Sequence, residues 1–170
     1  MSESTGGVTN VRRGSPTPAD LDGVDREILR ILRANARTPN NRLAELVGIA
    51  PSTCVARVKS LVARGVITGF TANVDPSAVG LSLQALISVT IRAGARNLMM
   101  ELGEEIRRFP EVVQLYFLGG AEDFIIHVAV RDSAAVRDFV LDNLSAHPAV
   151  ASTRTSLVFD HHFNGLTISA

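Results

Sequence analysis

The chain has 170 residues, of which 46% are hydrophobic and 20% are charged, and this composition excludes a chain that is disordered throughout. The formal net charge is zero, so the total charge indicates no particular partner. The single cysteine, Cys54, excludes an internal disulfide. No apolar run reaches the roughly 18–20 residues of a membrane span, and the amino terminus lacks the apolar core of a signal peptide. We therefore expect a cytoplasmic protein without a membrane segment.

The first helix is predicted from Asp20 to Asn35, after a Ser-, Thr-, Gly- and Pro-rich stretch at 1–19 that predicts a disordered tail. Asp20 or Asp22 can cap the helix, and Pro39 disfavours helix just before it. Apolar residues recur at helical spacing. They are Leu21, Val24, Ile28, Ile31 and Leu32.

Two shorter helices are predicted next. The first has Asn40 or Asn41 as its cap and ends at Gly48, a residue suited to a left-handed helix end. The second begins at Pro51 and ends at Gly65. The positions predicted to face inward are Leu43, Leu46 and Val47 in the first helix, and Val55, Val58, Leu61 and Val62 in the second. The β-branched stretch Val66–Val74 predicts a short strand or hairpin wing, followed by a linker to about Gly80.

The second half of the chain reads as β-α-β-β-α-β, the order of a ferredoxin-like sandwich. The predicted strands are Leu81–Arg92, Val112–Leu118, Phe124–Val130 and Val150–Phe159, and the predicted helices are Asn97–Phe109 and Ser133–Leu144. Helices cover only one face of such a sheet, so we expect a second copy of the chain to cover the other.

The predicted fold class is therefore α+β. It combines an N-terminal winged helix-turn-helix with a C-terminal ferredoxin-like βαββαβ dimerisation and effector domain. The predicted boundaries are a tail at 1–19, a helix-turn-helix DNA-binding domain at 20–66, a wing and linker at 67–80, a ferredoxin-like effector-binding and oligomerisation domain at 81–160, and a C-terminal tail at 161–170.

Basic residues concentrate in the predicted helix-turn-helix. Residues 37–64 carry five Lys and Arg against one acid, Glu45, a pattern typical of a nucleic-acid contact, although a solvated helix face gives the same count. With Val55, Val58 and Val62 taken as the buried direction, a helical wheel turns Thr53, Ala56, Arg57, Ser60 and Arg64 outward. Hydroxyls and small groups fit base edges, and arginine grips guanine or phosphate. The predicted set for double-stranded DNA is Asn40, Arg42, Ser52, Thr53, Ala56, Arg57, Lys59, Ser60 and Arg64.

The run LDGVDREILRILRANARTPNNRLAELVGIAPSTCVARVKSLVARGVITGFTANVDP closely resembles the N-terminal domain of the Lrp/AsnC (feast/famine) family. Three features carry the resemblance: the opening LDxxDxxIL, the core AELVGIAPSTCVARVKSL and the wing RGVITGFTAxVDP. It covers about residues 20–160. The resemblance implies a regulator of amino-acid metabolism genes whose C-terminal domain pairs subunits and senses a small molecule, usually an amino acid. It also implies a homodimer that assembles into an octamer.

The same resemblance implies an effector loop at residues 118–124 and ligand-facing hydroxyls on the last strand. Glycines expose backbone N–H groups to a carboxylate and Asp123 suits an α-ammonium, but a tight hairpin turn explains the glycines equally. Thr153 and Thr155 share one strand face with Arg154 on the other, and strand propensity explains this pair too. The predicted effector-binding set is Leu118, Gly119, Gly120, Ala121, Asp123, Thr153 and Thr155. Ala121 stands where relatives carry an acid, which favours a small neutral amino acid such as alanine.

The histidines lack the spacing of a metal site, and no catalytic triad or phosphate loop is present in the sequence. We therefore expect no cofactor, no metal and no enzymatic activity, and we interpret Cys54 as a packed core thiol. Two alternatives remain: a ligand-independent architectural DNA-binding protein, and a metabolic enzyme built on the ferredoxin-like half.

Overall fold

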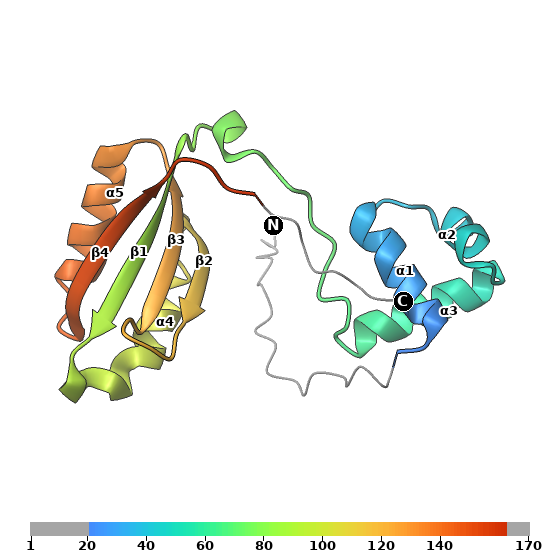
Figure 1. Cartoon of the computed structure of the whole chain (residues 1–170), viewed down its shortest axis with the longest axis horizontal. Helices are drawn as coiled ribbons and strands as arrows, with labels where there is room; N and C mark the ends of the chain where they lie inside the picture. Colours follow the sequence, from blue (N-terminus) through green and yellow to red (C-terminus); the bar gives the residue numbers. More distant parts are fainter. Residues whose placement is uncertain (1–20, 163–170) are drawn as a thin grey trace, which may run out of the picture. The chain divides into compact units, whose positions relative to one another are not determined.

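The computed structural model describes residues 21–162 of the chain. The chain divides between Ala72 and Asn73 into two compact units, which are drawn in Figure 1. The predicted tail at 1–19 lies outside the described residues, as does most of the predicted tail at 161–170. Each unit has its own hydrophobic core and is described separately.

Three helices form the first unit: α1 (Gly23–Ala34), α2 (Asn40–Val47) and α3 (Pro51–Ala63). Helix α1 starts where it does because Asp22 Oδ1 accepts a hydrogen bond from the backbone N–H of Asp25 at 2.8 Å. The apolar positions of α1 recur at helical spacing and join those of the other two helices in one core. The buried core is Ile28, Ile31, Leu32, Leu43, Ala44, Cys54 and Leu61.

The ends of α2 and α3 confirm the predicted glycine stops. Gly48 and Gly65 have φ values of 76° and 72°, which an L side chain adopts at a cost. The start of α2 differs from the prediction, because Pro39 occupies the capping position and no side chain caps the helix there. Asn40 and Asn41 instead lie inside the first turn of α2.

The predicted buried face of α3 is confirmed for Leu61 and wrong for Val55 and Val62, because the helix is rotated by about one residue relative to the prediction. Cys54 and Leu61 are fully buried, whereas Val55 and Val62 are 37% and 46% exposed. Leu46 on α2, also expected to face inward, is 48% exposed. Cysteine, leucine and valine all recur at helical spacing here, so the sequence pattern allows two rotations, and packing against α1 and α2 selects one of them.

The predicted wing strand is absent, because the described residues from Val66 to Val74 form no strand. Val66 and Ile67 instead pack on the helical core, and both of their N–H groups donate to the carbonyl of Leu61, at 2.9 and 3.1 Å. A strand needs a neighbour for its backbone hydrogen bonds, and the described part of this unit contains none. The linker ends in a short 3₁₀ turn, η2 (Pro76–Val79).

The second unit confirms the predicted β-α-β-β-α-β order. Its strands are β1 (Leu83–Ile91), β2 (Val112–Phe117), β3 (Phe124–Val130) and β4 (Val150–Val158), and its helices are η3 (Ala93–Leu98), α4 (Met99–Ile106), α5 (Ser133–Val140) and η4 (Leu141–Ser145). The strands lie in the order β2-β3-β1-β4 with every neighbouring pair antiparallel, as Figure 1 shows. This is the sheet of a ferredoxin-like sandwich.

Both predicted helices of this unit differ in detail from the sequence expectation. The helix expected at 97–109 is divided into the 3₁₀ helix η3 and the α-helix α4. Asp132, and not Ser133, caps α5, since its carboxylate accepts from the N–H of Ala135 at 2.9 Å. The helix continues through Leu144 as predicted, but its last turn is a π-helix.

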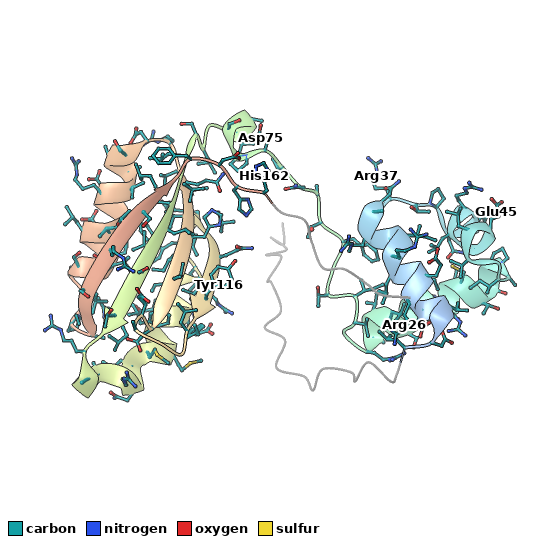
Figure 2. The ribbon with its side chains drawn as sticks, viewed as in Figure 1. Arg26, Arg37, Glu45, Asp75, Tyr116 and His162 are labelled. Carbon is teal, nitrogen blue, oxygen red and sulfur yellow. The ribbon has the colours of Figure 1, made fainter. Side chains whose placement is uncertain are left out.

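Strand alternation gives the sheet two unlike faces. One face packs against α4 and α5 in a single core, which includes Ile87, Val89, Ile126 and Val128. The other face carries the alternate residues, including Leu86 and Tyr116, which are 37% and 46% exposed. Tyr116 is labelled on β2 in Figure 2. We call this second side the open face.

Candidate functional sites

Helices α2 and α3 form the two limbs of a helix-turn-helix. They are bent by 100° across the turn that follows Gly48. In this motif the first helix crosses the DNA backbone and the second enters the major groove. None of the described helices is by itself long and apolar enough to cross a membrane, and this pair reaches such a composition only across its bend.

The outward face of α3 is polar and small. The residues Ser52, Thr53, Ala56, Lys59 and Ser60 are all exposed, on the side away from Cys54 and Leu61. Hydroxyl groups suit base edges, alanine suits the thymine methyl group and lysine suits phosphate. Five of the nine residues predicted for DNA therefore lie together on one accessible surface.

Arg57 and Arg64 differ from the helical-wheel prediction, because their guanidinium groups lie against α1. Arg57 Nη1 donates to Asp22 Oδ2 at 2.7 Å and to Asp25 Oδ1 at 2.8 Å. Arg64 Nη1 lies 3.8 Å from Asp25 Oδ2. We call these four residues the α1–α3 ion cluster. The helical wheel turned both arginines outward because it took Val55, Val58 and Val62 as the buried side. In the structure Cys54 and Leu61 form the buried side, and this rotation of α3 brings both arginines to α1.

Two members of the ion cluster, Asp22 and Arg57, have shifted pKa values. The pKa of Asp22 is lowered, first by the hydrogen bond from the N–H of Asp25 and next by the Arg57 guanidinium. The pKa of Arg57 is raised, mainly by its hydrogen bonds to Asp22 and then to Asp25. The charged forms of Asp22 and Arg57 are therefore favoured.

Asn40 and Arg42, predicted to anchor the DNA backbone, also have partners in the protein. Asn40 Nδ2 donates to the carbonyl of Pro51 at 3.1 Å, which joins the starts of α2 and α3. Arg42 Nη1 lies 3.0 Å from Glu45 Oε2, and both side chains are more than half exposed. An exposed pair of this kind contributes little and exchanges readily for phosphate. Figure 2 labels Glu45 on this unit.

The loop between β2 and β3 contains the predicted effector glycines. Neither Gly119 nor Gly120 has a positive φ, and a Cβ added at either would meet no atom within 4 Å. Neither position therefore requires glycine for its backbone conformation or for space. Leu118 and Ala121 are exposed in the same loop, so the loop presents backbone to solvent without conformational strain.

Asp123, predicted to meet an α-ammonium, is 9% exposed and already bonded. Its Oδ2 accepts from the backbone N–H of Ile91 at 2.7 Å, and Oδ1 lies 3.9 Å from Arg96 Nη2. Its own backbone N–H donates to the carbonyl of Val89 at 3.0 Å. The carboxylate thus fastens the loop to the end of β1, a role that sequence spacing does not reveal because the two residues are 32 positions apart.

Thr153 and Thr155 lie on the helix-covered side of the sheet, since they pair with Val89 and Ile87 of β1. Arg154 points to the other side, as predicted, and forms an ion pair with Glu122. Thr155 borders a cavity of about 340 Å³ between α5 and β4. The other residues of its wall are Ser133, Val136, Arg137, Val140, Leu141 and Leu157. The walls of this cavity include no residue of the 118–123 loop, so the predicted effector set is divided between two places.

Cys54 is fully buried, and burial raises the pKa of its thiol. The prediction of a packed core thiol is confirmed. Among residues 21–162, His, Cys, Asp and Glu form no group of three or more that could hold a metal ion.

A helix-turn-helix unit joined to a separate βαββαβ unit is the architecture of a two-domain DNA-binding regulator, and comparison with known proteins identifies its family. A family model described as winged helix-turn-helix DNA-binding matches residues 21–68, and one described as Lrp/AsnC ligand binding domain matches residues 84–166. The chain belongs to the Lrp/AsnC family of transcriptional regulators.

Two curated relatives and one solved structure illustrate this membership. The chain is 55% identical over 144 residues to the HTH-type transcriptional regulator AldR of Mycobacterium tuberculosis. This alignment covers 85% of this chain and 80% of AldR. The chain is 50% identical over 165 residues to AldR of Mycolicibacterium smegmatis, and this alignment covers 95% of this chain and 96% of that protein. The crystal structure of the Neisseria meningitidis regulator NMB0573 with L-Met is 34% identical, with a TM-score of 0.78 over 86% of this chain and 96% of the other.

Proposed function

We propose that the protein is a sequence-specific transcription regulator whose DNA affinity or oligomeric state responds to an amino acid, and that it controls genes of amino-acid metabolism. The observation that carries the proposal is the exposed face of α3, with its hydroxyl groups, its small Ala56 and Lys59, in a chain that also has a ligand-binding domain of the Lrp/AsnC family.

The DNA contacts follow from exposure and charge. Thr53, Ala56 and Ser60 read base edges in the major groove, and Lys59 contacts phosphate. Ser52, Asn40 and Arg42 lie in the first turns of α3 and α2, where backbone N–H groups also favour an anion. Arg57 and Arg64 reach DNA only by exchanging Asp22 and Asp25 for phosphate.

Amino-acid sensing is supported by the matched ligand-binding domain and by the L-Met complex of the Neisseria relative. We place the effector at the exposed 118–121 loop, and Thr153 and Thr155, on the helix-covered side of the sheet, mark a second candidate position. Asp123 contributes by holding the loop on β1, because its carboxylate is committed to the N–H of Ile91. A small neutral amino acid such as alanine fits the Ala121 position, where the family resemblance implies an acid, and is the first ligand to test.

Self-association is supported by apolar side chains that a monomer leaves in water. Leu86 and Tyr116 are 37% and 46% exposed on the open face, and Phe159, just after β4, is 97% exposed. Burial of such a surface against a second copy gives a closed two-fold dimer. We propose that dimers of this kind assemble further into the octamer typical of the family.

The DNA-binding site is tested with a duplex that the protein itself selects from a random-sequence pool. Binding is measured by fluorescence anisotropy over a range of salt concentrations. Lys59→Ala should weaken binding and reduce the salt slope by about one unit, the loss of one phosphate contact. Arg107→Ala, a matched loss of positive charge in the other unit, should leave both unchanged. An unchanged slope in Lys59→Ala would remove α3 from the DNA interface.

Sensing is tested by thermal unfolding with each of the twenty amino acids. A ligand that binds the folded state raises the melting temperature. The same amino acid should then change the anisotropy titration or the mass measured by light scattering. If no amino acid changes stability, DNA affinity or mass, the sensing part of the proposal fails, and a ligand-independent architectural protein is the better description.

A further inference from the structure

The α1–α3 ion cluster places two carboxylates between the arginines of the recognition helix and the rest of α1. Asp25 is only 6% exposed, which is unusual for a charged side chain in so small a unit. Both hydrogens of Arg57 Nη1 are used, one on each aspartate. Arg57 retains 32% and Arg64 33% side-chain exposure, so both stay within reach of solvent and of a nearby anion.

The geometry of the two helices explains why four residues meet. Arg57 and Arg64 are seven residues apart, so they lie two turns apart on one side of α3. Asp22 and Asp25 are three residues apart at the start of α1, where Asp22 also caps the helix. The cluster contains two negative and two positive side chains, so its formal charge is zero.

A neutral cluster changes what α3 offers to DNA. Each arginine that contacts phosphate adds affinity for every sequence, because the backbone charge is the same along all DNA. Asp22 and Asp25 compete with phosphate for Arg57 and Arg64, and thereby withhold that sequence-independent affinity. Among residues 21–162, the hydroxyl groups and Ala56 on the outward face have no such acidic partner, and groups of this kind respond to the base sequence.

We propose that Asp22 and Asp25 are specificity-determining positioning residues, which hold Arg57 and Arg64 on α1 and so suppress binding to non-operator DNA. This inference rests on the proposed function, in which α3 is the helix that contacts DNA. It adds that the acidic residues of α1 set the ratio of operator to non-operator affinity without touching DNA themselves.

The test removes the two negative charges and keeps the shape of the side chains. In Asp22→Asn/Asp25→Asn, asparagine still caps α1 and still accepts hydrogen bonds, but no longer neutralises the arginines. Kd is measured for the full chain with a duplex selected from a random pool and with a scrambled duplex of the same composition, at several salt concentrations. Far-UV circular dichroism verifies that the helices are retained.

The double variant should bind the scrambled duplex roughly tenfold more tightly at 0.1 M salt and show a salt slope steeper by about 1–2 units, since each new phosphate contact adds about 0.9. The ratio of selected to scrambled affinity should fall. Glu27→Gln, matched in charge to Asp22→Asn alone, removes one negative charge from α1 at the Glu27–Arg30 pair, away from the cluster, and should leave the slope unchanged.

Two further variants keep the outcome decisive. Asp22→Asn by itself affects a half-exposed residue and should shift the slope in the same direction by a smaller amount. Adding Arg57→Gln to the double variant should reverse about half of the slope change. An unchanged slope in the double variant, or an equal change in Glu27→Gln, overturns the proposal. If Lys59→Ala also leaves binding unaltered, the proposed DNA site fails as well, whereas a weakened Lys59→Ala confines the failure to the ion cluster.

Discussion

Replacement of Asp123 by alanine should destabilise the second unit by about 2 kcal/mol. The carboxylate accepts a charge-assisted hydrogen bond from the N–H of Ile91 at 2.7 Å, and Ile91 is 4% exposed. A bond of this kind is worth about 1.5–3 kcal/mol, and a buried donor left unpaired costs about 1–3 kcal/mol. The pair with Arg96 adds little, because it spans 3.9 Å and Arg96 is 71% exposed.

The chain offers a spectroscopic probe for this unit. Tyr116 is the single tyrosine in a chain without tryptophan, so intrinsic tyrosine fluorescence reports unfolding of the ligand-binding unit and not of the helical one. In thermal unfolding, Asp123→Ala should lower the melting temperature by roughly 10 °C, because each kcal/mol lost shifts it by about 4–8 °C in a domain of this size. Asp123→Asn keeps an acceptor for Ile91 and should cost only about 1 kcal/mol.

The two variants also separate a structural role from a ligand contact. If Asp123 holds the loop in place, Asp123→Asn should still respond to the effector amino acid. If the carboxylate binds the α-ammonium directly, that response should disappear while stability is nearly retained. The structural argument is refuted if Asp123→Ala unfolds within about 0.5 kcal/mol of the parent chain.

Three further results are expected. Gly103→Ala should lower the free energy of unfolding by about 1–2 kcal/mol, because a Cβ there meets the ring of Phe117. Gly94→Ala, with open space around it, is the control, and an equal loss of stability in both variants would contradict a clash with Phe117. Burial lowers the pKa of His127 below its ordinary value of 6.5. The unfolded chain therefore binds the proton more readily, and the stability of the fold should fall as the pH decreases through 6.5. His127→Gln should flatten this pH dependence of the melting temperature, and an unchanged dependence would show that another group titrates. Ile28→Ala, at a fully buried site, should cost about 2–5 kcal/mol and abolish DNA binding. The effector should still raise the melting temperature of the second unit, followed by tyrosine fluorescence; loss of both responses would mean that the two units do not fold independently.

The elements of the fold were largely predictable from local patterns. Helix α1 followed from apolar residues at helical spacing and a capping aspartate, and the left-handed conformations of Gly48 and Gly65 followed from their places at helix ends. The β-α-β-β-α-β order followed from alternation and breakers, and β3 has the predicted bounds, Phe124–Val130. These signals are local, so one sequence suffices to read them.

The errors arose wherever two local patterns were equally good or a distant partner decided. On α3, the valines and the Cys54–Leu61 pair offered two helical stripes, and only packing against α1 and α2 chose between them. The predicted wing of Val66–Val74 had strand propensity but no neighbouring strand in the described unit. Propensity does not supply the hydrogen-bond partner that a strand needs.

The sequence by itself therefore determined the family, the order of elements and the side-chain types on α3. Tertiary structure decided the direction in which those side chains act. It turned Arg57 toward Asp22 and Asp25, and it committed the carboxylate of Asp123 to Ile91. Ionic and hydrogen-bonding partners that are some 30 positions apart in the chain become neighbours only when the elements pack, and no local period records such a distance.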